Sequence, residues 1–169
     1  FSGNEAILAR LRQIKTADEI ALLRRLSRIA DQSITDALAA VKTGDSEMDI
    51  AAHMTRNIYT LGAEHFKLMI VATGERSQLP NVGPSERRLV AGDGIGLHLH
   101  EDPYIGKTPE IGKSGDAQLE AGMVLGVEPL CYQTGYGYGM QNKDMMLVTD
   151  TGFELLSDYA NTDRLLVVR

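Results

Sequence analysis

The stretch that decides the fold contains three apolar-rich segments: GIGLHLHEDPYI (94–105), LEAGMVLGVEPLCY (119–132) and GYGYGMQNKDMMLVTDTG (135–152). In each segment apolar residues alternate with others or run together over the length of a strand, which predicts β-structure. Each segment also carries polar side chains that can meet at one site: His98 and His100, then Glu128, then Lys143 with Asp144. The sequence therefore predicts a sheet with one shared functional site.

Two amphipathic helices are predicted before this sheet. Thr16 and Glu19 have the spacing of a capping box, and apolar residues then recur at helical spacing until Gly44 can end the helix. Ser46 can cap a second helix that ends at Gly62. Helices first and a mainly antiparallel sheet afterwards are the pattern of an α+β domain.

The remaining segments predict further strands and loops. Prolines exclude a helix from the polar loop 74–85. The glycines of 135–139 do not lie between a strand and a helix, so a wide turn or a close backbone approach explains them better than phosphate binding. The expected strands are Phe66–Val71, Gly94–Glu101, Met123–Tyr132, Met145–Thr149, Phe153–Leu156 after a hairpin turn, and Leu165–Val168.

Composition limits the classes of partner. The 169 residues carry 17 basic and 23 acidic side chains, a net charge of −6, which argues against a nucleic-acid or anionic-membrane surface. The chain has one cysteine, Cys131, which excludes an internal disulfide and suits a reducing, cytoplasmic location; a packed core thiol is expected. No apolar run approaches the ~20 residues that span a bilayer.

The polar residues of the sheet differ in how strongly they indicate function. His98 and His100 project from the same strand face, where they can bind a metal or move protons, although a partly exposed pair is the simpler interpretation. Glu128 interrupts an apolar run, and a carboxylate in such a strand is costly unless it is paired, protonated or bound to metal, which favours a functional role. Lys143 and Asp144 alone indicate an exposed ion pair at a strand start.

As an ordered set, these segments resemble the pita-bread family, which includes creatinase, aminopeptidase P, prolidase and methionine aminopeptidase. The resemblance extends to RQIKTADEIALLRRLSRIAD (12–31) and VATGERSQLPNVGPSERRLVAGD (71–93), and so covers nearly the whole chain. It implies an incomplete pita-bread fold over residues 1–169, without the N-terminal domain common in the family. It also implies homodimers, and a site where two divalent ions such as Mn, Co or Zn activate water for amide hydrolysis.

The resemblance assigns roles to individual residues. Glu128 matches a metal-binding Glu and is the residual ligand, and His100 matches a His that contacts substrate and stabilises the intermediate, so both are candidate catalytic residues. Asn81 stands where the family often has a loop His, and it is a candidate substrate-binding residue together with His98. Lys143 occupies the position of the second Glu ligand, and Asp93 that of the ligand His.

Two departures from the family pattern affect the metal site. Asp93 runs directly into Gly94, where the family has a segment of several dozen residues with both Asp ligands, so a gap or deletion is expected at this junction. Lys143 replaces attraction for a divalent ion by repulsion, and we expect it to form an ion pair with Glu128. We therefore assign no cofactor to the chain, and we expect its two-metal site to be incomplete.

The resemblance and these departures lead to two hypotheses of function. In the first, the protein is a hydrolase of amide-type C–N bonds in a small peptide or guanidino-type substrate, with His100 as acid/base, as in the metal-independent creatinases. In the second, it is a non-catalytic relative that binds a peptide or protein partner.

Overall fold

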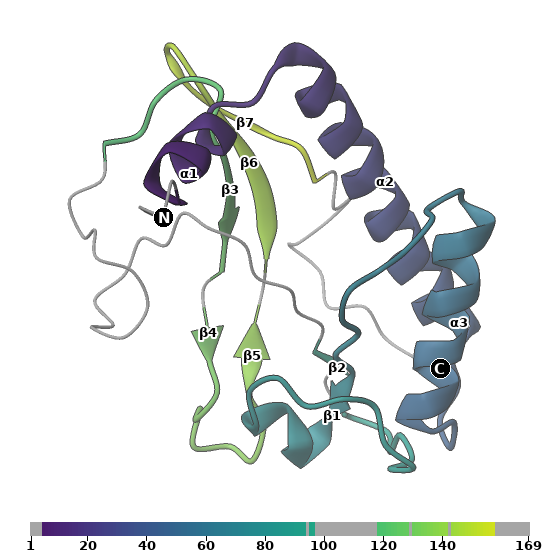
Figure 1. Ribbon diagram of the computed structural model, residues 1–169. Coiled ribbons are helices and arrows are strands. Elements are labelled where there is room, and N and C mark those ends of the chain that lie inside the picture. The colour runs from purple at the N-terminus through teal and green to yellow at the C-terminus, as the bar shows by residue number, and fades with distance from the viewer. Residues whose placement is uncertain (1–4, 94, 97–117, 129, 142, 158–169) are drawn as a thin grey trace.

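The computed structural model describes residues 5–93, 95–96, 118–128, 130–141 and 143–157. Three helices come first and the strands follow, so the predicted α+β order is confirmed (Figure 1). The helices are α1 (Glu5–Gln13), α2 (Ala17–Ala40) and α3 (Glu47–Thr60), and a short 3-10 helix, η1, spans Gly74–Gln78. The strands are β1 (Ala72–Thr73), β2 (Ile95–Gly96), β3 (Val124–Val127), β4 (Leu130–Cys131), β5 (Met140–Gln141), β6 (Asp144–Thr149) and β7 (Gly152–Leu155).

Both predicted helix starts are confirmed by capping boxes. The Thr16 hydroxyl accepts from the backbone N–H of Glu19, whose carboxylate accepts from the N–H of Thr16 at 2.8 Å. Ser46 and Asp49 form the same reciprocal pair at the start of α3. These bonds satisfy N–H groups that have no partner inside a helix, and they fix where each helix begins.

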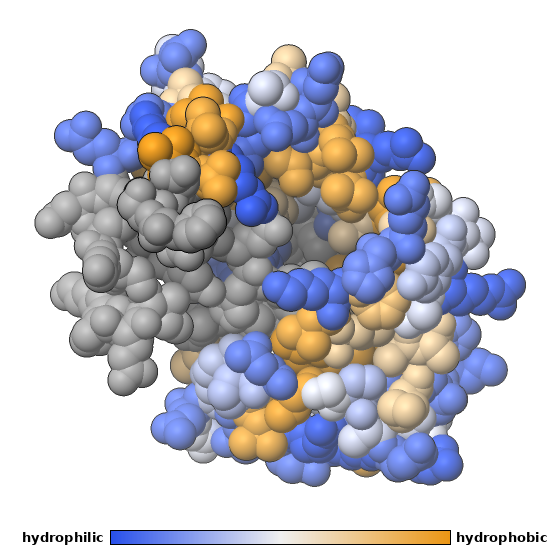
Figure 2. All heavy atoms as spheres, in the orientation of Figure 1, coloured by the Kyte–Doolittle hydropathy of each residue, from blue (hydrophilic) through white to orange (hydrophobic). Residues whose placement is uncertain are grey.

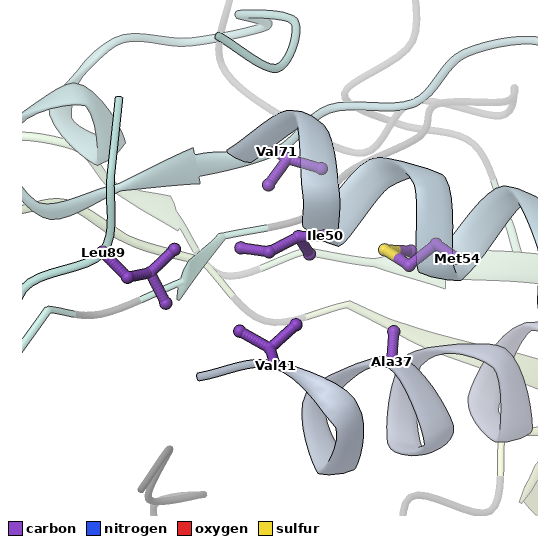
Figure 3. Packing of buried hydrophobic residues seen from close by; sticks show 6 residues of the cluster. All are labelled: Ala37, Val41, Ile50, Met54, Val71 and Leu89. Carbon is purple, nitrogen blue, oxygen red and sulfur yellow. The ribbon is translucent and has the colours of Figure 1, made fainter. Parts of the chain in front are cut away.

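The two long helices pack against each other over one hydrophobic core. α2 ends at Ala40, and Gly44 adopts a left-handed φ of 96° in the turn that leads to α3. The core joins the end of α2, one face of α3 and two later segments (Figure 3). Its buried members are Ala37, Val41, Ile50, Met54, Val71 and Leu89.

Among the described residues the largest sheet is three-stranded and antiparallel, in the order β3-β6-β7. The predicted hairpin is confirmed, because Thr149 pairs with Gly152 across a tight turn between β6 and β7. One face of this sheet buries Val124 and Leu147 against the first half of α2, where Ile20 and Leu23 contact them. Helix α2 therefore packs on the sheet at one end and on α3 at the other (Figure 1).

Several predictions about the elements are wrong. The strand expected at Phe66–Val71 does not form: pairing with β2 begins only at Ala72, and Leu68 is exposed. Alternating hydrophobicity reports burial, whereas a strand also needs a ladder partner, and no ladder joins residues 66–71 to another described segment. Helix α1 was not predicted, and the loop 74–85, predicted to be free of helix, begins with η1.

The expectation of a packed core thiol is also wrong, because Cys131 lies exposed on β4. The β4–β5 pair is a two-stranded ribbon outside the three-stranded sheet. Of the strand predicted at Gly94–Glu101, the structure describes only β2, and the strand at Leu165–Val168 falls outside the described residues.

The visible surface is mostly polar, with apolar groups between the charged side chains (Figure 2). One such group lies over α1, where Ile7, Leu8 and Leu11 are exposed. In the part of the chain that the structure describes, no helix has the length and apolar character needed to cross a membrane.

Candidate functional site

The candidate site lies where a long antiparallel ribbon is interrupted. The β3–β6 ladder ends with Val127 opposite Asp144, and the β4–β5 ladder resumes in the same register three residues further on. Continuing that register through the break places Glu128 opposite Lys143. Pro129 follows Glu128, and proline has no backbone N–H to give to a ladder, which accounts for a break at this point.

Glu128 and Lys143 form the predicted ion pair, between Oε1 of the carboxylate and Nζ of the ammonium group. Both side chains are largely buried, with 11% of Glu128 and 19% of Lys143 exposed, and Oε1 itself is shielded from solvent. Charges removed from water attract each other more strongly than surface charges do, and each needs the other to offset its lost hydration. The ribbon therefore holds the two opposite charges together, largely shielded from solvent.

Gly126 makes room for the lysine. A Cβ atom at this position would lie 3.0 Å from Cε of Lys143 and 3.5 Å from its Nζ. The cross-strand neighbour of Gly126 is Met145, so Lys143 reaches over the glycine diagonally on its way to Glu128. No role was predicted for Gly126, although a glycine inside an apolar strand signals such a close approach.

Tyr132 is a second residue that the sequence analysis did not identify. Burial raises the pKa of its phenol, and the negative charge of Glu128 raises it further. At neutral pH the Tyr132 phenol therefore keeps its proton and can donate a hydrogen bond. Glu128 thus has a cation and a neutral phenol in its surroundings.

The other predicted site residues belong to other segments than the ribbon or fall outside the described residues. Asn81 lies exposed in the loop after η1, with a left-handed φ of 56°. Asp93, which the resemblance matched to a ligand His, is held by Arg87, whose Nη1 lies 2.5 Å from its Oδ2. That hydrogen bond lowers the pKa of Asp93, so the residue serves a structural ion pair. His98 and His100 fall outside the described residues.

The described residues do not fit a two-metal centre. Among them no three His, Cys, Asp or Glu side chains lie close enough together to hold a metal ion. A divalent ion beside Glu128 would also meet the ammonium group of Lys143, which repels it. The carboxylate of Glu128 is instead neutralised by a cation of the protein itself, the ammonium group of Lys143.

A buried carboxylate outside the ribbon was also missed. Glu47, in the first turn of α3, is fully buried and accepts hydrogen bonds from Thr73, Ser85 and Arg76. An acidic residue in the first turn of a helix is normally solvated and favoured by the helix dipole, so the sequence contains no local signal of this role.

Part of the chain matches a known family. Residues 90–150 match the model of Metallopeptidase family M24. The chain is 29% identical over 126 residues to the Xaa-Pro dipeptidase of Pyrococcus furiosus, covering 71% of this chain and 36% of that protein. An uncharacterized peptidase of Staphylococcus aureus strain USA300 is 21% identical over 238 positions, covering 94% of this chain and 66% of the relative.

Solved structures extend the likeness to almost the whole fold. The dipeptidase PepE from Mycobacterium ulcerans superposes with a TM-score of 0.78 at 20% identity, covering 98% of this chain and 63% of that one. The prolidase from Pyrococcus furiosus gives a TM-score of 0.77 at 21% identity, covering 92% and 68%. The fold is therefore the pita-bread fold of these dipeptidases.

Residues 90–150 are thus similar to metallopeptidase family M24, and the chain has the pita-bread fold. The chain spans about a third of the length of the Pyrococcus Xaa-Pro dipeptidase, as the 36% coverage gives.

Proposed function

We propose that this chain is a hydrolase of amide-type C–N bonds in a small peptide or guanidino-type substrate, and that it works without a complete two-metal centre. The ion pair of Glu128 and Lys143 carries the proposal, because it places a cation of the protein where a metal ligand is expected. The relationship to Xaa-Pro dipeptidases supports the bond type and the small substrate.

In this proposal the chemistry is acid–base catalysis by protein side chains. A water molecule adds to the carbon of the C–N bond and gives a proton to His100, which passes it to the leaving nitrogen. Glu128 accepts a hydrogen bond from the substrate, and Lys143 fixes the orientation of its carboxylate. Asn81 and His98 contact the substrate.

A second candidate function is peptide or protein binding without catalysis. The same ion pair favours it, because a carboxylate that is already neutralised by Lys143 is less able to activate water. In that case the pita-bread scaffold would be kept for its shape, and the site would recognise a ligand without turning it over.

Turnover assays separate these two candidates. We expect the wild-type protein to hydrolyse Xaa-Pro dipeptides or creatine equally well with EDTA and with added Mn²⁺ or Co²⁺, and His100→Ala to abolish the reaction. Turnover that requires the metal would contradict the metal-free mechanism. Ligand binding without turnover would favour the second candidate.

A charge reversal tests the role of Lys143 without an activity assay. In Lys143→Glu two carboxylates face each other across the ribbon, so Mn²⁺ should raise the melting temperature of this variant and leave that of the wild type unchanged. Lys67→Glu is the matched control, since Lys67 is exposed and distant in the chain. A wild-type protein stabilised by Mn²⁺ would show that Lys143 does not exclude the ion.

We also propose a gap or deletion between Asp93 and Gly94 relative to the family, and a deletion is the form that the following experiment tests. The alignment with the Staphylococcus relative supports this, because its 238 positions exceed the 169 residues of this chain. Tryptic digestion should release residues 89–107 as one peptide that crosses the junction. Its absence from the mass spectrum, with the flanking peptides present, would contradict a covalent junction.

The expected assembly is a cytoplasmic homodimer. The exposed apolar side chains of α1 are compatible with a contact between copies, and the net charge of −6 does not favour a nucleic-acid partner. Light scattering after size-exclusion chromatography should give twice the mass of the chain, and a monomer would contradict the dimer.

A further inference from the structure

Glu47 joins the two ends of the loop formed by residues 73–85, and we call this junction the neck of the loop. Its buried carboxylate accepts from the backbone N–H and the hydroxyl of Thr73, at 2.8 and 2.9 Å, and from the N–H and the hydroxyl of Ser85, at 3.0 and 2.7 Å. Arg76 completes the shell through its guanidinium group. Because Thr73 and Ser85 lie at the two ends of the loop, a single carboxylate holds those ends together.

Arg76 adds a second tie inside the loop. Besides contacting Glu47, its Nη1 donates to the Ser85 hydroxyl at 2.8 Å and its Nη2 donates to the carbonyl oxygen of Gly83 at 3.1 Å. The outgoing arm of the loop and its returning arm are thus bound to the same buried charge. Two backbone N–H donors and a guanidinium in one shell are the arrangement that makes a buried carboxylate favourable.

The same loop is attached to the ribbon that carries the candidate site. The N–H of Gly139, in the turn between β4 and β5, donates to Oγ of Ser77 at 2.9 Å, and Ser77 donates to the carbonyl of Gly74 at 2.5 Å. A Cβ atom at position 139 would lie 2.2 Å from the Ser77 carbonyl oxygen, so only glycine allows this approach. η1 and the turn accordingly lie side by side (Figure 1).

Asn81 lies on the returning side of this loop in an unusual conformation. Among the described non-glycine residues it has the one positive φ, 56°, and its side chain is exposed. Such residues persist where the surrounding structure holds them, and they are frequent at ligand sites. The amide of an asparagine can both donate and accept, which suits the amide, carboxylate or guanidino groups of the proposed substrates.

We propose that Glu47 is a positioning residue that presents Asn81 to a small peptide or guanidino-type ligand of the ribbon site. The inference rests on the proposed function for the identity of the ligand. The fixing of the loop does not depend on that function, because the hydrogen bonds of Glu47 hold the loop whether or not a reaction occurs. Glu47 itself touches no reacting atom.

The test removes the charge of Glu47 and keeps the shape of its side chain. In Glu47→Gln the amide nitrogen faces N–H and O–H donors, so the neck should loosen. We expect hydrogen exchange in residues 76–84 to accelerate about tenfold or more while exchange in α2 stays at its wild-type rate. Glu75→Gln is the matched control, because Glu75 lies in the same loop but is mostly exposed and bonded to Arg87.

Steady-state kinetics with an Xaa-Pro dipeptide then distinguish positioning from stability. Glu47→Gln should raise KM about tenfold and leave kcat within about twofold, because ligand contact is lost and the chemistry is not. Asn81→Ala should give the same shift in KM, and the double variant should be no worse than either single one, because both changes remove one contact.

The possible outcomes are separable. Unchanged loop exchange in Glu47→Gln overturns the inference, and so does an unchanged KM in a variant whose loop exchange has risen. A wild-type protein that neither binds nor hydrolyses the dipeptide overturns the proposed function, and the positioning role with it, even where the exchange result confirms the closed neck. If Glu47→Gln does not fold, Ser85→Ala removes one hydroxyl partner and should shift both readouts in the same direction by less.

Discussion

Two buried carboxylates, Glu47 and Glu128, are held in different ways. Glu47 is fully buried in the helical half of the molecule, and it accepts hydrogen bonds from the backbone N–H groups of Thr73 and Ser85, which are distant in the sequence. Glu128 keeps 11% of its side chain exposed at a break in the ribbon, and it faces the ammonium group of Lys143.

The difference separates a structural carboxylate from one that is available for chemistry. Backbone donors have fixed positions, so a carboxylate that they surround cannot rotate or exchange partners without opening the chain. An ammonium group at the end of four methylene groups can move with its partner, and a ligand can replace it. The way in which a buried charge is satisfied is therefore more informative about function than burial alone.

The largest effect should come from removing the structural carboxylate. Glu47→Ala leaves Arg76 and two backbone N–H groups without their acceptor, and we expect the free energy of unfolding to fall by about 3–5 kcal/mol. Urea denaturation at pH 7 measures it. Glu86→Ala, at an exposed glutamate, should change stability little. A loss below about 1 kcal/mol in Glu47→Ala would mean that water replaces the carboxylate at no great cost.

An intermediate effect is expected at the ribbon. Lys143→Met keeps the length of the side chain but removes the cation beside Glu128, which should cost about 1–3 kcal/mol. The double variant Glu128→Leu/Lys143→Met should regain most of this loss, because no charge then remains buried. If the double variant is as unstable as the sum of the single ones, the two side chains are not coupled.

The exposed capping box shows how much the same hydrogen bond contributes in solvent. Thr16→Ala removes the hydroxyl that accepts from the N–H of Glu19, and we expect a loss of about 1 kcal/mol. Thermal unfolding followed by circular dichroism measures it. Thr35→Ala, an exposed threonine within α2, is the control. A loss equal to that of Glu47→Ala would show that burial adds nothing to these bonds.

The smallest effect concerns acid stability at an exposed carboxylate. The hydrogen bond from Arg87 lowers the pKa of Glu75 from its ordinary value of 4.5 to about 2. Its contribution is therefore present above pH 4.5 and is lost as the pH falls toward 2. Glu75→Gln should lose less stability than the wild type over this interval.

A second carboxylate, that of Asp93, also contributes to the dependence of stability on pH in this experiment. Arg87 also lowers the pKa of Asp93, so acid unfolding of Glu75→Gln should still depend on pH to some extent. Equal losses in the variant and the wild type would show that the Arg87–Glu75 bond does not persist in solution.

Local signals allowed part of this structure to be predicted. The Thr16–Glu19 box depends on partners three residues apart, so the sequence shows it directly. The turn at 135–139 was also predictable, because Gly135 and Gly137 have positive φ values and Gly139 permits a close backbone approach. The Glu128–Lys143 pair followed from comparing the strand pattern with a known family.

Contacts between distant segments were not predictable. The partners of Glu47 lie 26 and 38 residues away at Thr73 and Ser85, and nothing near Glu47 distinguishes it from a solvated acidic residue. The expected strand at 66–71 failed for a related reason, because hydrophobic alternation does not reveal whether a second strand is available to pair. A single sequence reports what each segment prefers, and not which segment it meets.

The shared register on both sides of the ribbon break has an evolutionary consequence. One residue inserted between Glu128 and β4 would turn every following side chain to the opposite face and separate the two ladders. We therefore expect a change of length to be tolerated less than a substitution here: a substitution at 143 changes one charge and keeps both ladders, whereas a change of length would displace the site. Another pair of side chains could replace the ion pair and keep the ladders, but only at the same two positions.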